Sequence, residues 1–310
     1  MRTRAWLALG AGAAGVAGAV DTGVVAMPGM PVTEPAAAEG PTLHVVERGV
    51  LGPTLVFLPG VGGTTRYWES RVAPLASDYR LLLVDPLGFG HSPKPETTYS
   101  VERHVAELRR VLAGRGRLTL VGHSFGALLA VAYAARYPEA VDGLVLMGLP
   151  YFGSEERALA HFRRGPAPSR WVMTNVAFAS AACVITRRVV VRALPQLLPD
   201  LPREVTEDLV QHTWRSSTST LWEVVYRYDA APDAARLPAT LPVLVLHGER
   251  DSTAPLDGVR RLMRGHPAWQ LAVRPEGDHH LLLRDPAWVL AMIRSFLATP
   301  RAVIATAPAA

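Results

Sequence analysis

The sequence feature that most constrains the fold is a serine flanked by glycines where a strand gives way to a helix. Residues 118–121 form a short apolar run typical of a buried strand, and residues 127–136 are strong helix formers without Gly or Pro. The segment between them, Gly122-His123-Ser124-Phe125-Gly126, matches the pattern G-x-S-x-G. Because the turn must be very tight, the pattern predicts Ser124 in a strained, exposed position, facing the positive N-terminal end of the helix.

Other strand-like runs alternate with helical patterns along the chain. Alternation of this kind predicts an α/β fold, with a mostly parallel central sheet and helices on both faces. We assign residues 43–150 and 239–298 to this core. The runs that we expect to form strands are 43–48, 54–58, 80–84, 118–121, 141–147, 242–247 and 269–273.

The strand signal stops between residues 151 and 238. Helical patterns divided by prolines fill this segment, which predicts an all-helical insertion that forms a lid over one end of the sheet. Residues 171–185 are apolar and are followed by Arg187, Arg188 and Arg192. This stretch is compatible with a buried lid helix or with a surface that meets lipid. The helices that we expect here span residues 155–164, 171–198, 203–212 and 221–228.

The two ends of the chain differ in composition from the rest. Residues 1–26 carry Arg2 and Arg4 before an uncharged Ala/Gly-rich run, as a signal peptide or membrane leader would. A loosely ordered leader on a cytoplasmic protein explains the same residues equally well. Residues 27–42 are rich in Pro, Ala and Gly and indicate a linker, and residues 299–310 indicate a frayed tail.

Composition narrows the function classes. Hydrophobic residues make up 49% of the 310 residues and charged residues 19%, which is typical of a globular chain. The net charge of +5 comes from scattered arginines without interleaved aromatics, which argues against nucleic-acid binding. Cys183 is the only cysteine, so an intrachain disulfide is excluded. The histidines show no ligand spacing, and we expect neither a metal nor an organic cofactor.

Five segments together resemble the α/β-hydrolase superfamily over residues 43–297. Within that fold the catalytic residues follow the order Ser, Asp, His. The resemblance implies Ser124 as nucleophile, Asp251 after the sixth strand as the orienting carboxylate, and His279 after the last strand as the base. His280 is the rival base. The five segments are residues 55–63, 85–92, 122–126, 247–255 and 277–286.

The resemblance also implies an oxyanion hole. It would combine the backbone N–H of Phe125 with a second N–H from the glycine loop after residue 58, for which Val61 is our first choice and Gly62 the alternative. The loop opens with Pro59-Gly60 where the family more often has His-Gly, which leaves the loop geometry open.

These residues predict a serine hydrolase that cleaves an ester or related carbonyl compound through an acyl-enzyme intermediate. The expected substrate is small and apolar, and a membrane contact through the leader is the only other partner that the sequence suggests. Three alternatives stay open, namely a C–C bond hydrolase, a perhydrolase and a non-catalytic ligand sensor. The residues expected to line the substrate site are Gly60, Gly62, Tyr151 and Trp222.

Overall fold

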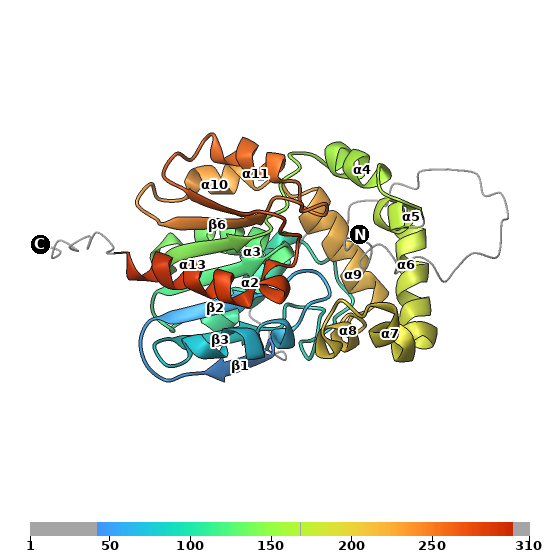
Figure 1. Ribbon diagram of the computed structural model, residues 1–310, viewed down its shortest axis with the longest axis horizontal. Coiled ribbons are helices and arrows are strands. Elements are labelled where there is room, and N and C mark those ends of the chain that lie inside the picture. Colours follow the sequence, from blue (N-terminus) through green and yellow to red (C-terminus); the bar gives the residue numbers. More distant parts are fainter. Residues whose placement is uncertain (1–41, 168, 300–310) are drawn as a thin grey trace, which may run out of the picture.

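A seven-stranded sheet runs through the molecule in the order β1-β3-β2-β4-β5-β6-β7 (Figure 1). The computed structural model describes residues 42–167 and 169–299. The expected leader and nearly all of the expected linker and tail lie outside these residues. No helix in the described ranges is long and apolar enough to cross a bilayer. The strands are β1 (Val45–Arg48), β2 (Thr54–Leu58), β3 (Arg80–Val84), β4 (Leu118–His123), β5 (Val141–Met147), β6 (Val243–Gly248) and β7 (Gln270–Arg274).

All neighbouring strands are parallel except the edge pair, in which β1 runs antiparallel to β3 and Val45 lies opposite Val84. The observed sheet confirms the predicted α/β fold. Because parallel strands are buried on both faces, β2 is fully buried from Thr54 to Leu58. Its alternate side chains enter two different apolar clusters, one on each face of the sheet.

Helices cover both faces. The first cluster packs under α2 (Val101–Leu112), α3 (Phe125–Arg136) and α11 (Leu256–Met263). The second packs under the segment of α1 (Glu69–Val72) and under α12 (Leu281–Arg284) and α13 (Pro286–Ala298). Helix α3 is buried along nearly its whole length, as its apolar sequence requires.

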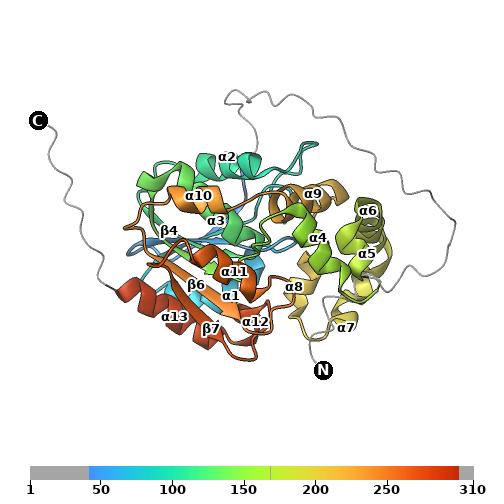
Figure 2. The ribbon, with the colours of Figure 1, turned by 90° about the horizontal axis from the view of Figure 1, so that it is seen from above.

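A helical insertion occupies the chain between β5 and β6 and lies at one end of the sheet (Figures 1 and 2). The insertion meets the loops that follow β2 and β3. Ser216 Oγ, for example, donates to the Gly88 carbonyl at 2.8 Å. Its helices are α4 (Glu155–Arg163), α5 (Ser169–Thr174), α6 (Val176–Ile185), η5 (Thr186–Val190), η6 (Val191–Ala193), α7 (Leu194–Leu197), α8 (Arg203–Asp208), α9 (Trp214–Thr220), η7 (Leu221–Tyr226) and α10 (Ala231–Arg236).

The helix boundaries in the insertion differ from those expected. The predicted helix over residues 171–198 is divided, because Asn175 adopts an extended conformation and caps α6 with its side-chain oxygen. The predicted helix over 203–212 ends at Asp208, and His212 instead pairs with Phe89 in an isolated antiparallel bridge. The first departure comes from a local side-chain cap that competes with the helix, and the second accompanies a tertiary bridge.

Candidate active site

The turn between β4 and α3 holds Ser124 in an unusual backbone conformation. Its φ of 54° and ψ of −119° lie outside the regions that a residue with a side chain prefers. Glycines on both sides are required by space, since a Cβ on Gly122 would lie 2.4 Å from the Gly126 carbonyl oxygen. A Cβ on Gly126 would lie 2.1 Å from the Leu58 oxygen. Ser124 itself stays partly exposed, whereas both neighbours in the turn are buried.

A carboxylate and an imidazole meet beside this turn. Asp251 Oδ2 lies 2.7 Å from His279 Nδ1, so that ring nitrogen donates to the carboxylate. The other oxygen of Asp251 accepts from the backbone N–H groups of Thr253 and Ala254, at 2.9 and 2.8 Å. Burial alone raises the pKa of Asp251, but the His279 ring and these hydrogen bonds outweigh it and hold the pKa below its usual value. The carboxylate is therefore charged and fixed in orientation.

His279 is tied to the Ser124 turn through its backbone and its ring. His123, the residue before Ser124, donates from Nε2 to the His279 carbonyl at 2.9 Å, and the two rings lie 4.8 Å apart. Gly148, at the end of β5, lies under the pair, since a Cβ there would be 3.1 Å from His279 Nδ1. The ends of β4, β5, β6 and β7 thus converge on one place. An imidazole whose Nδ1 donates its proton carries its acceptor lone pair on Nε2, so Nε2 is the atom of His279 that can take a proton.

The rival base His280 occupies a different environment. Asp251 bonds to His279, while the His280 ring lies among His123 and Tyr67, with centroid distances of 5.4 and 6.3 Å. Burial is the main cause that holds the pKa of His280 well below its usual value. The geometry therefore favours His279 over His280 as the base.

The glycine loop after β2 packs against the Ser124 turn. Gly63 donates its N–H to the Gly60 carbonyl at 3.0 Å, and Gly62 has a φ of 78°, which together define a type II turn. A Cβ on Gly60 would lie 3.3 Å from the Cβ of Ser124. The Val61 peptide is therefore near the serine, and α3 begins at Phe125, whose N–H has no acceptor within the helix. The positions of these two peptides suit the expected oxyanion hole, in which the N–H groups of Phe125 and Val61 would be the donors.

Three polar residues that the sequence did not single out join this loop to the insertion. Thr64 donates its hydroxyl to Asp208 Oδ2 at the end of α8, and Arg66 Nη1 lies 2.8 Å from Asp208 Oδ1. Leu209 also faces the loop, 3.6 Å from the position of a Cβ on Gly62. Burial raises the pKa of Asp208 more than Thr64 and Arg66 lower it. No sequence signal pairs Thr64 with Asp208, because 144 positions separate them.

The two aromatic residues expected at the substrate site belong to the helical insertion and to the segment that follows β5. Trp222 is 8% exposed and packs edge-on against Tyr226, whose hydroxyl donates to the Met173 carbonyl at 2.7 Å. Tyr151 follows β5 and is half-buried, and its pKa is raised by burial and by Asp229. Among the described contacts, none joins Trp222 or Tyr151 to Asp251 or His279, so their role stays a prediction.

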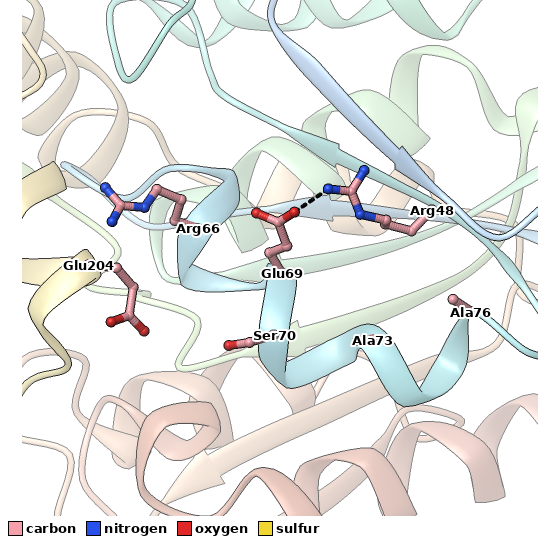
Figure 3. Close-up of a pocket in the computed structure, with 7 residues that line it drawn as sticks. All are labelled: Arg48, Arg66, Glu69, Ser70, Ala73, Ala76 and Glu204. Carbon is pink, nitrogen blue, oxygen red and sulfur yellow. Dashed lines mark hydrogen bonds and ion pairs between the residues drawn. The ribbon is translucent and has the colours of Figure 1, made fainter.

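Two other features of the structure lie away from Ser124, Asp251 and His279. A hollow of about 360 Å³ opens between α1 and α8 (Figure 3). The ion pair of Arg48 with Glu69 forms part of its lining, and none of the expected catalytic residues lines it.

A cluster of possible metal ligands lies elsewhere, where one side-chain atom each of His44, Asp85 and His91 lies within 4.8 Å of the others. The Asp85 oxygens already accept the backbone N–H groups of Thr65 and His91, at 2.6 and 2.8 Å. Asp85 therefore braces two loops, as a structural residue does.

Comparison with known proteins places the chain in a family. A model described as alpha/beta hydrolase fold matches residues 53–179, and one described as TAP-like protein matches residues 209–303. The strand order of the sheet and the turn at Ser124 are those of the fold that these models describe. The chain therefore belongs to the α/β-hydrolase superfamily and is, by fold and family, an α/β-fold hydrolase.

Several relatives carry functional names. The probable lysophospholipase BODYGUARD 1 of Arabidopsis thaliana is 30% identical, over 73% of this chain, and the chain spans about half of that protein's length (54%). The 2-(acetamidomethylene)succinate hydrolase of Mesorhizobium japonicum is 27% identical, over 83% of this chain and 91% of its own. The crystal structure of the enol-lactonase from Burkholderia xenovorans superposes with a TM-score of 0.65, over 84% of this chain and 98% of its own, at 23% identity. That last likeness is one of fold.

Proposed function

We propose that the protein is a serine hydrolase that cleaves an ester or related carbonyl compound through an acyl-enzyme intermediate. The observation that carries the proposal is the hydrogen bond between Asp251 and His279, held against the strained turn of Ser124. A serine hydroxyl becomes an effective nucleophile when an imidazole accepts its proton and a carboxylate orients that imidazole. The relative named probable lysophospholipase supports the same reaction class.

The residues divide the reaction into two steps. Ser124 Oγ attacks the substrate carbonyl carbon as His279 Nε2 takes its proton, and Asp251 stabilises the resulting imidazolium. The negative charge on the carbonyl oxygen falls between the backbone N–H groups of Phe125 and of Val61 or Gly62. His279 then gives the proton to the leaving alcohol, which departs and leaves Ser124 acylated. His279 then deprotonates a water that attacks the acyl-enzyme, and it returns that proton to Ser124 Oγ as the acid is released.

An apolar substrate is supported by the residues that follow β5. Gly148 lies under His279, and the chain continues through buried Leu149 to Phe152. The Phe152 ring packs on Phe162 of α4 at 5.7 Å, and Phe162 in turn packs on Tyr226 at 5.5 Å. The part of the insertion nearest the β5 end is therefore aromatic and apolar. We propose that the acyl or alcohol group of the substrate binds on this side.

A panel of p-nitrophenyl esters, from acetate to laurate, tests the function. The proposal expects turnover that rises and then falls with chain length, so that one length shows the highest kcat/KM. The absence of turnover on every ester would contradict an esterase. Covalent reaction of Ser124 in the same protein would then favour the C–C hydrolase or perhydrolase alternatives, and its failure would favour a ligand sensor.

A further inference from the structure

The arginines are scattered along the chain, but the excess of positive over negative charge falls in one segment of the insertion, because that segment has no acidic residue. Residues 157–199 contain seven arginines and no Asp or Glu, whereas the other 267 residues contain 25 Lys and Arg against 27 Asp and Glu. The excess charge of the whole chain therefore lies in this segment. Within residues 42–167 and 169–299, none of these seven arginines forms an ion pair with a carboxylate. Their charges face solvent unneutralised.

The same segment exposes most of the large apolar side chains on the described surface. Eight such side chains are exposed among the described residues, and five of them belong to this segment. Trp171 of α5 and Phe178 of α6 stack on each other at 5.9 Å, yet remain 48% and 53% exposed. Two large aromatic rings that pack together and still face solvent indicate a surface that another phase or partner covers. The five residues are Trp171, Val176, Phe178, Val189 and Leu197.

The exposed apolar and basic residues follow one another along α6 and the segments that continue it. Helix α6 continues through η5 and η6, and its inner side is marked by Ala179 and by Cys183, whose sulfur lies 3.5 Å from His212 Nδ1. Phe178 and Val189 are exposed, whereas Ala179 is buried and Cys183 contacts His212, so the two exposed side chains lie on the side of the helix away from this inner side. Arg188 of η5 and Arg192 of η6 stand beside these apolar residues in the chain and are exposed as well.

We name this exposed set the outer face of α6. It comprises Trp171 of α5, Phe178 of α6, Arg188 and Val189 of η5 and Arg192 of η6. Figures 1 and 2 both place α6 at the outer side of the insertion, remote from β4 and β6.

We infer that the outer face of α6 binds an anionic membrane surface. Exposed aromatic and aliphatic side chains beside arginines are the composition of an interfacial helix, in which the rings enter the headgroup region and the arginines pair with lipid phosphates. Charge complementarity selects this occupant. A second copy of the chain would bring the same arginines together and be repelled, and a neutral surface would leave them unpaired.

An environment-sensitive label on the face itself tests the inference. The full chain carries Cys183→Ala, so that a single NBD fluorophore can be attached at Phe178→Cys. The matched control carries it at Ser77→Cys, an exposed position before β3 at the opposite end of the sheet. Each protein is titrated with vesicles of phosphatidylcholine alone, or of phosphatidylcholine with phosphatidylglycerol.

We expect the emission at position 178 to shift to the blue and to increase with the anionic vesicles alone. Addition of 1 M NaCl should abolish both changes, because salt screens the attraction. Arg188→Gln with Arg192→Gln should weaken the partition by about 25-fold, at about 1 kcal/mol for each arginine near the surface. Equal responses at positions 178 and 77 would overturn the inference. So would binding that the double substitution leaves unchanged, as binding through residues 1–26 alone would give. A blue shift of the emission at position 178 that appears without vesicles, as the protein concentration rises, would show that a second copy of the chain covers the face instead.

Discussion

Ser124 occupies a backbone conformation that costs about 1–3 kcal/mol for a residue with a side chain. The cost is tolerated because Ser124 N donates to the Met147 carbonyl at 2.8 Å, and because α3 is buried on the sheet just after it. The conformation separates the serine side chain from both β4 and α3. A strained serine, partly exposed at a helix N-terminus, is the arrangement that a nucleophile requires.

The choice between His279 and His280 gives a prediction at the residue scale. His279→Ala should lower kcat roughly 10⁴- to 10⁶-fold, because the proton acceptor and the partner of Asp251 are lost together. His280→Ala should change kcat less than about tenfold, while it lowers the melting temperature through the buried space it leaves near Tyr67. Ester hydrolysis by both folded variants, measured below their melting temperatures, checks this. A larger loss of kcat in His280→Ala would show that the base lies one residue further along.

At the scale of elements, α8 is the part of the insertion that reaches the glycine loop. Asp208 accepts from Thr64 and pairs with Arg66, and both follow that loop directly. Arg71 adds a second link, from Nη2 to Glu204 Oε1 at 2.9 Å. The position of the insertion and the geometry of the expected oxyanion loop are therefore coupled through α8.

Substitution of Asp208 tests this coupling. Asp208→Asn keeps the volume but removes the buried charge opposite Arg66, so the loop donors should lose their fixed position. We expect kcat to fall roughly tenfold with little change in KM, since oxyanion contacts act in the transition state. The control is Glu207→Gln, because Glu207 also pairs with Arg66 but lies at the surface. Equal kcat values for the two variants, or an effect on KM alone, would contradict a positioning role for Asp208.

The elements also show how far sequence reasoning reaches. All seven strands lie close to the runs that predict them. For the five inner strands the reason is that a parallel strand buried on both faces must be largely apolar, whereas the edge strands β1 and β7 are only partly buried. The glycines at 122 and 126 predict the turn for the same direct steric reason. The helix ends at Asn175 and Asp208 could not be predicted, since side-chain caps and a bridge to Phe89 decide them. The link between Thr64 and Asp208 was missed because only tertiary structure brings them together.

At the scale of the whole molecule, buried neutral histidines make stability depend on pH. Burial lowers the pKa of His104 to about 3 and is also the main cause that lowers the pKa of His123 to about 3. In the unfolded chain a histidine binds a proton near pH 6.5, so the unfolded state takes up more protons below that pH. The stability that these residues provide is present above pH 6.5 and is lost as the pH falls toward 3.

We therefore expect the free energy of unfolding to fall between pH 7.5 and pH 5 by about 2 kcal/mol for each of these two histidines. Urea denaturation at both pH values measures it. His104→Gln should reduce the fall by about 2 kcal/mol, because it removes one titrating group while its amide can still bond to Thr220, the partner of His104 Nε2 at 3.2 Å. An unchanged pH dependence in that variant would show that His104 does not titrate on unfolding.

The central claim is that Ser124 is the nucleophile, and covalent labelling tests it most directly. A fluorophosphonate reacts with a serine that a neighbouring base activates, forming a Ser–O–P bond and releasing fluoride. The account predicts one adduct per chain, located by peptide mass spectrometry on Ser124, and no adduct in Ser124→Ala. An adduct on another residue, or equal labelling of Ser124→Ala, would contradict it.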